Sequence, residues 1–217
     1  MILEYLGHSC FRITTKNNTT ILTDPYTKVG YELPTSLTAD VVTVSHGHFD
    51  HNYIDGVKEV EKIVDTVGSH QYKDVCIDGF ICNHDEKGGV LRGKNIVFTI
   101  MADGYKICHL GDIGEACNQE ITEKIGKVDV LLIPVGGTYT IDAKGAKDYV
   151  DKIAPKLVIP MHYKPIDGKL DIADEKEFLS LCNIKYPVCE NGVLDLDKAL
   201  ERKERLVFMK RRNYDGK

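Results

Sequence analysis

The chain has 217 residues, 42% hydrophobic and 28% charged, which suits a single compact domain over residues 1–217. Its formal net charge of −5 provides no positive field to attract nucleic acid or an anionic membrane. No apolar run approaches the ~18 residues of a transmembrane helix, and residues 1–5 lack the pattern of a secretory signal. We therefore expect a cytoplasmic protein without a nucleic-acid or membrane partner, and the sequence leaves a homo-oligomer open.

The seven cysteines are odd in number and include no Cys-x-x-Cys pair. This pattern favours reduced thiols in a cytosolic protein over a disulfide framework or a cysteine zinc site.

The first half of the chain is predicted to be rich in strands. Residues 11–14 and 20–23 flank a polar turn at 16–18, which indicates a hairpin. Residues 41–44 form an apolar run typical of a buried strand. Residues 53–65 carry apolar side chains at helical spacing and predict an amphipathic helix.

The middle of the chain predicts a second set of strands. Residues 75–82 alternate weakly between apolar and polar, as a strand does. Residues 95–100 and 105–110 are apolar runs joined through Asp103 and Gly104, a strong hairpin signal.

The rest of the chain alternates strands and helices. The expected strands are 128–135, 157–161, 192–196 and 206–210, and the expected helices run from Asp142, as N-cap, to Ile153 and over 173–182. Residues 211–217 are predicted to be a polar tail. A β-rich start followed by β-α-β units indicates an α/β fold with two packed sheets and helices outside.

One six-residue stretch dominates the chemistry. His46-Gly47-His48-Phe49-Asp50-His51 holds three imidazoles and a carboxylate directly after a predicted strand. His46 and His48 can face one cation, while Asp50 and His51 turn towards a second. This donor set suits zinc, iron or manganese.

Three further residues follow predicted strands and are candidate ligands: His84, Asp112 and His162. Gly111 would let the backbone approach closely while the Asp112 carboxylate points inward. A carboxylate has two oxygens, so Asp112 could bridge two cations. For each of the three, a core or surface role is the alternative.

Other polar residues have less certain roles. Asp24 would either accept the second N–H of a ligand histidine or form an Asp-Pro turn. His8 would either face the pocket or be structural. His109 would contact a metal ligand without binding the metal itself. Tyr139, Tyr163 and Arg92 are candidates for substrate contact, with Arg92 suited to a phosphate.

Several short segments, in order along residues 2–165, resemble the metallo-β-lactamase superfamily. Within it, they resemble the branch of small metal-dependent hydrolases that includes L-ascorbate-6-phosphate lactonase. The segments are Gly7-His8-Ser9-Cys10, Thr23-Asp24-Pro25, Ser45 to His51, His84-Asp85-Glu86, His109 to Asp112, Pro134 to Thr140 and Ile159 to Tyr163.

The resemblance implies an αββα four-layer sandwich and a ligand assignment. His46, His48 and His84 would hold one divalent metal, Asp50, His51 and His162 a second, and Asp112 would bridge them. Di-iron relatives carry glutamate where this chain has His48, so zinc, and after it manganese, is expected. The acidic charge and the lack of an evident RNA-binding arm disfavour tRNA processing.

The expected activity is hydrolysis of a small anionic ester, lactone or phosphodiester, a phosphorylated sugar-acid lactone being favoured. Two cations ~3.5–4 Å apart lower the pKa of a shared water, and the resulting hydroxide attacks carbon or phosphorus. Asp50 is a candidate proton acceptor as well as a ligand, and Asp112 completes the catalytic pair of carboxylates. The alternative is a metal-binding regulatory module without turnover, against which the complete ligand set argues.

Overall fold

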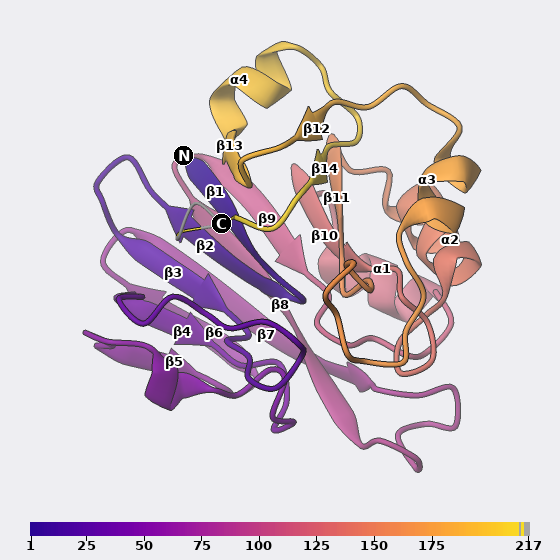
Figure 1. Ribbon diagram of the computed structural model, residues 1–217, viewed down its shortest axis with the longest axis horizontal. Coiled ribbons are helices and arrows are strands. Elements are labelled where there is room, and N and C mark those ends of the chain that lie inside the picture. The colour runs from indigo at the N-terminus through magenta and orange to yellow at the C-terminus, as the bar shows by residue number, and fades with distance from the viewer. Residues whose placement is uncertain (213, 215–217) are drawn as a thin grey trace.

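The computed structural model describes residues 1–212 and 214 and shows two six-stranded mixed sheets packed face to face (Figure 1). From edge to edge, the first sheet consists of β13 (Val193–Asp195), β1 (Ile2–Gly7), β2 (Cys10–Thr14), β3 (Thr20–Thr23), β4 (Val41–Thr43) and β5 (Lys62–Val64). The second consists of β11 (Leu157–Met161), β10 (Val130–Pro134), β9 (Tyr105–His109), β8 (Lys94–Ala102), β7 (Val75–Asn83) and β6 (Gly68–Tyr72).

The helices are short and unevenly distributed. Figure 1 shows α1 (Gln119–Ile125), α2 (Ala143–Ile153) and α3 (Lys176–Cys182) gathered on the side of β10 and β11. The helix α4 (Leu196–Glu201) directly follows β13, and a two-stranded parallel sheet joins β12 (Val188–Cys189) to β14 (Phe208–Met209). The α/β class with two sheets between flanking helices is as predicted.

The strands β3 and β4 of the first sheet are buried on both faces, and coil forms much of their outer cover. Ile21 of β3 and Val41 of β4 face the main core between the sheets. Their neighbours Leu22 and Val42 belong to a second apolar cluster, which residues of the 24–44 segment complete. A strand buried on both faces needs a continuous apolar run, which explains the composition of β3 and β4.

The predicted helix over residues 53–65 is wrong. Only a 3₁₀ turn, η1 (Ile54–Gly56), forms there, and Lys62–Val64 instead pairs with β4 as the parallel edge strand β5. The backbone N–H groups of Glu61 and Lys62 donate to the carbonyl of Asp40. These long-range hydrogen bonds replace the helical ones, so tertiary pairing overrides the local pattern.

Most other predicted elements are confirmed, with bounds shifted by a few residues. The β8–β9 hairpin turns through Asp103 and Gly104, both at positive φ. The elements β1, β6, β12, α1 and α4 were not predicted. The tail begins later than expected, because Arg211 pairs with Asp167 at 2.6 Å and Arg212 pairs with Glu4. Residues 213 and 215–217 lie outside the described residues.

Two parallel stretches set the position of most of the candidate site residues. In the first sheet β3, β4 and β5 run parallel, and in the second β9, β10 and β11 do so. The loops that follow parallel strands emerge at one edge, which is where α/β proteins place their chemistry. Within the described part of the chain, no helix is long and apolar enough to cross a membrane.

The N-cap of α2 provides a test of the fold. The Asp142 side chain accepts the Gly145 N–H at 2.8 Å, whereas Asp151, on the same helix, only pairs with Lys147 at the surface. We expect Asp142→Ala to lower the free energy of unfolding by about 0.5–2 kcal/mol, and the control Asp151→Ala by less than about 0.5 kcal/mol. Urea unfolding followed by circular dichroism measures both. Equal effects would contradict the capping role.

Candidate metal centre

Six chain segments that follow strands bring their polar side chains to one place. From the first sheet come His8 after β1, Asp24 after β3 and the His46–His51 segment after β4. From the second sheet come His84 after β7, Asp112 after β9 and His162 after β11. The site therefore spans both sheets, and all seven side chains expected to bind metal lie in it.

The buried carboxylate of Asp112 lies at the centre of this group. Its Oδ1 is 3.2 Å from Nε2 of His51. Its Oδ2 is 3.2 Å from Nε2 of His162, 3.5 Å from that of His84 and 3.9 Å from that of His46. One carboxylate thus faces four imidazoles through its two oxygens, as a residue positioned between two cations would.

Potential ligand atoms form overlapping groups within 4.8 Å of one another. One group matches the first expected ligand set: His46, His48 and His84. A second contains the other expected set and one more residue: His8, Asp50, His51 and His162. A third links the two: His46, His51 and Asp112.

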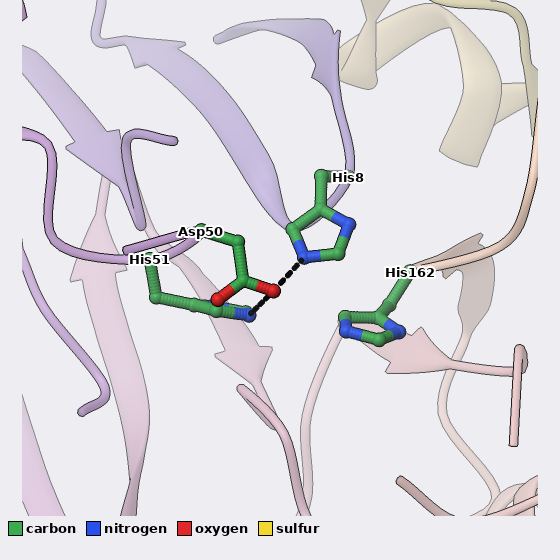
Figure 2. Close-up of side chains that lie close together, drawn as sticks. All are labelled: His8, Asp50, His51 and His162. Atoms are coloured by element: carbon green, nitrogen blue, oxygen red, sulfur yellow. Dashed lines mark ion pairs between the residues drawn. The ribbon is translucent and has the colours of Figure 1, made fainter. Parts of the chain in front are cut away.

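His8 belongs to the second group although the expected ligand sets do not include it (Figure 2). The sequence left its role open. Its Nε2 is 3.2 Å from Oδ2 of Asp50, and its ring centroid is 4.1 Å from that of His162. Its carbonyl also accepts the backbone N–H of His162 at 2.8 Å. Because His8 is buried and faces the ligand group, it is placed to bind a cation or to orient Asp50 rather than to touch substrate.

The unpaired polar atoms of the site fit a cation. Among the described residues, the Nε2 atoms of His46, His51, His84 and His162 and the Oδ1 atom of Asp112 are buried without a hydrogen-bond partner. Leaving such atoms unpaired is costly. Imidazole nitrogen and carboxylate oxygen are the donors that zinc and similar divalent ions prefer, so the residues present fit a metal.

Protonation favours metal binding at His46, His8 and Asp112. Burial lowers the pKa of His46 to about 3 and that of His8 to about 4. Burial disfavours the Asp112 carboxylate, but the charges of His162 and His51 outweigh it and hold the pKa of Asp112 well below its usual value. Neutral imidazoles and an ionised carboxylate are the forms that ligate metals. At His51 burial lowers the pKa, but Asp112 and Asp24 outweigh it and raise the pKa well above its usual value, so a cation binding there would displace a proton.

Asp24 and Ser45 fix the orientation of two histidines. Asp24 Oδ2 lies 2.8 Å from Nδ1 of His51 and accepts the Ser45 hydroxyl at 2.6 Å. The same hydroxyl is 3.0 Å from Nδ1 of His46. With both Nδ1 atoms engaged, Nε2 of His46 and His51 are left for a metal. The supporting role expected for Asp24 is therefore present, and Ser45 is a partner that the sequence did not single out.

A second support holds the turn that carries Asp112. Asn95 accepts the Asp112 N–H at 2.9 Å and donates to the Leu110 carbonyl at 2.9 Å. Gly111 has φ +54°, and a Cβ there would lie 2.3 Å from Oδ1 of Asn95. His109 bonds the Ser9 carbonyl through Nε2 and accepts the Gly111 N–H on Nδ1. The sequence analysis missed Asn95, because its only signal is that it is a polar residue in an otherwise apolar strand.

A cavity of about 510 Å³ opens above the centre. Arg92 and Tyr139 line it, and the Arg92 guanidinium lies 5.5 Å from the centroid of the Tyr139 ring. Asp85 fixes the loop that carries Arg92, since its carboxylate accepts four backbone N–H groups between Lys87 and Arg92. Both residues therefore border the cavity as expected.

Tyr163 does not border this cavity, which corrects the sequence-based expectation. Its hydroxyl donates to the Met209 carbonyl at 3.0 Å, and its ring packs between Tyr5 and Phe208. His162 has φ +50°, so the chain turns sharply there and directs the next side chain elsewhere.

Comparisons with known proteins agree with this geometry. A family model described as the beta-lactamase superfamily domain matches residues 2–162. The chain belongs to the metallo-β-lactamase superfamily. Within it, the chain is 30% identical to a UPF0173 metal-dependent hydrolase of Thermoplasma volcanium, over 74% of this chain and 82% of the relative. The finer likeness to L-ascorbate-6-phosphate lactonase stays a prediction.

Solved structures of the superfamily share the fold. A Thermotoga maritima protein, described as a zinc-dependent hydrolase of the metallo-β-lactamase superfamily, superposes with a TM-score of 0.77. It is 36% identical, and the match covers 96% of this chain and 97% of the other. Igni18, a metallo hydrolase from Ignicoccus hospitalis, has a TM-score of 0.66 at 21% identity, covering 98% and 96%. The UPF0173 relatives and the Thermotoga maritima structure, both described as metal-dependent hydrolases, place the chain in that class.

The Asp24 network yields a prediction about metal affinity. Asp24→Asn keeps the shape of the side chain but removes the charge that orients His51, so we expect metal affinity to fall by about 10–100-fold. Titration against a chelating dye measures the affinity, and circular dichroism checks the fold. Asp40→Asn is the control, because Asp40 also binds backbone and hydroxyl donors of β3 but at Thr20, the other end of the strand. An Asp24→Asn protein with wild-type affinity would contradict the role.

Proposed function

We propose that this protein is a dinuclear metal hydrolase whose seven ligands divide as the superfamily resemblance implies. His46, His48 and His84 would hold one cation, Asp50, His51 and His162 would hold the other, and Asp112 would lie between them. The observation that carries the proposal is the position of Asp112, whose two oxygens face imidazoles from both sets at 3.2–3.9 Å. His8, 3.2 Å from Asp50, lies beside the second set and would orient that carboxylate.

A carboxylate between the two sites offsets the mutual repulsion of the cations. When bound, two divalent ions acidify a water molecule and polarise the oxygen of the bond that is cleaved. The imidazole-rich donor set favours zinc first and manganese second. Asp50 lines the cavity and lies beside His8, so it is positioned to receive a proton from the attacking water as well as to bind metal.

The cavity supports an anionic substrate. Arg92 is the one lysine or arginine among the described residues that line it, and it can pair with a carboxylate or phosphate. Tyr139 on the same wall can donate its hydroxyl to the oxygen that becomes negative during the reaction. The reaction class is therefore hydrolysis of a small anionic ester, lactone or phosphodiester.

A binding or regulatory module without turnover is the second candidate. Such a protein needs no cavity that exposes the ligands, yet His48, Asp50, His84 and Asp112 all line one here. Incubating zinc- and manganese-loaded protein with a panel of lactones, carboxylic esters, thioesters and phosphodiesters separates the two. Metal-dependent turnover of one bond class supports the hydrolase, and none across the panel supports the module.

The ligand count predicts the metal content. We expect the loaded protein to bind about two equivalents of zinc, and the His84→Ala and His162→Ala variants about one each, since each loses a ligand of one site. Asp112→Ala should lose at least one equivalent and all measurable hydrolysis. Elemental analysis after dialysis gives the content. A wild-type metal content that saturates at one equivalent, or wild-type turnover by Asp112→Ala, would contradict the dinuclear assignment.

The two tyrosines form a matched pair for testing substrate contact. Tyr139→Phe removes a hydroxyl at the cavity. We expect kcat to fall by about 10–100-fold, less than the ~10²–10³-fold of a fully buried oxyanion donor, because water reaches this partly exposed ring. Tyr163→Phe should leave kcat unchanged, because its hydroxyl binds the Met209 carbonyl. Both variants should keep wild-type metal content. A normal kcat in Tyr139→Phe would assign the oxyanion contact elsewhere.

A further inference from the structure

The cavity above the metal centre combines a polar floor with apolar walls. His48, Asp50, His84 and Asp112 form the floor, whereas Phe49, Leu170 and the Tyr139 ring form much of the walls. Phe49 is 51% exposed although it lies between two candidate metal ligands. Single exposed apolar residues are ordinary, but several that meet in one concave site indicate a ligand that covers them.

Phe49 and Leu170 are held in place by the same segment of the chain. The Phe49 carbonyl accepts the backbone N–H of Thr27 at 3.2 Å. The backbone N–H of Lys169, next to Leu170, donates to the Val29 carbonyl at 2.9 Å, and Leu170 packs against the second apolar cluster. The apolar wall is therefore fixed by backbone hydrogen bonds.

The space beside this wall is open. Gly47 also lines the cavity, and a Cβ built on it would meet no atom within 4 Å. A substituent next to the bond that is cleaved can thus extend over Gly47 along Phe49. The Arg92 guanidinium, which would pair with the anionic group of the substrate, belongs to a different loop and lies against Tyr139.

We infer that the substrate is an anionic ester or lactone that carries an apolar group of several carbons, seated against Phe49 and Leu170. This inference rests on the proposed function and narrows its substrate class. A phosphorylated sugar acid would place hydroxyl groups against these apolar walls and lose their hydrogen bonds with water. An alkyl or aryl group instead removes apolar surface from water on both sides.

Hydroxamic acids test the wall without relying on turnover, because the hydroxamate group chelates zinc whatever the reaction. The probes are acetohydroxamate and octanohydroxamate, bound to zinc-loaded protein and followed by calorimetry. A buried methylene contributes about two- to fourfold in affinity. We therefore expect octanohydroxamate to bind at least about 10-fold more tightly than acetohydroxamate.

Alanine variants test whether Phe49 and Leu170 provide the additional affinity for octanohydroxamate. Phe49→Ala and Leu170→Ala should each reduce the ratio of the two affinities by about three- to tenfold. The ratio is used because a change in metal content affects both probes alike. Leu170 is the second variant because, unlike Phe49, it is not adjacent in the chain to a candidate metal ligand. Ile63→Ala is the matched control, since Ile63 is 45% exposed on β5 and does not line the cavity. It should keep the wild-type ratio.

The outcomes separate the two proposals. Equal affinities for the two probes, or a ratio that survives both cavity variants, would overturn the apolar-substrate inference while leaving the metal centre intact. Failure of the zinc-loaded protein to bind either probe would instead count against the accessible metal centre on which both proposals depend.

Discussion

The placement of one buried carboxylate, Asp112, between histidines from two sheets is the constraint on which the site depends. An ionised carboxylate is costly to bury unless charges or donors surround it. Here His51, from the first sheet, and His84 and His162, from the second, approach it within 3.5 Å. These histidines offset the cost of burying the ionised carboxylate. The same arrangement places the carboxylate where it could lie between two cations.

The supporting residues act on backbone geometry more than on charge. Asn95 and Gly111 allow the chain after β9 to turn tightly enough for Asp112 to face inward. Three residues of the site adopt positive φ without being glycine: His8, Asp24 and His162. Such conformations cost energy and persist where the surrounding structure enforces them, most often at functional sites. The hydrogen bond from the His162 N–H to the His8 carbonyl enforces two of them at once.

Much of this could be predicted from the sequence because its signals are local. The apolar runs before His46, Asp112 and His162 mark strands, and a polar residue directly after a buried strand has few places to point other than the sheet edge. The helix expected over 53–65 failed for the opposite reason. Its apolar spacing is real, but β4 offers a parallel edge that saturates the backbone of Lys62–Val64. Pairing between distant segments has no signature in a local window.

The tyrosines illustrate the same limit at the level of side chains. Tyr139 and Tyr163 each follow a strand and a turn, so sequence alone gives them equal standing. Their positions differ because the Tyr163 hydroxyl donates to the carbonyl of Met209, 46 residues further along the chain. Asn95 and Ser45 show the converse, since their value comes from partners that neighbouring strands bring near. Ser45 meets Asp24 across the parallel pair β3 and β4, and Asn95 meets the turn that follows its antiparallel neighbour β9. A candidate ligand set can thus be predicted from motif order, while the residues that orient it emerge only from the packed fold.

The division of ligands between the sheets links metal binding to the integrity of the sandwich. His46, His48, Asp50 and His51 follow a strand of the first sheet, and His84, Asp112 and His162 follow strands of the second. Each proposed cation would therefore connect both sheets, and its binding energy would oppose their separation. The apolar core between the sheets already aligns the two edges before any metal binds. The packing thus carries the cost of ordering the ligands, so more of the metal-binding energy remains available for affinity.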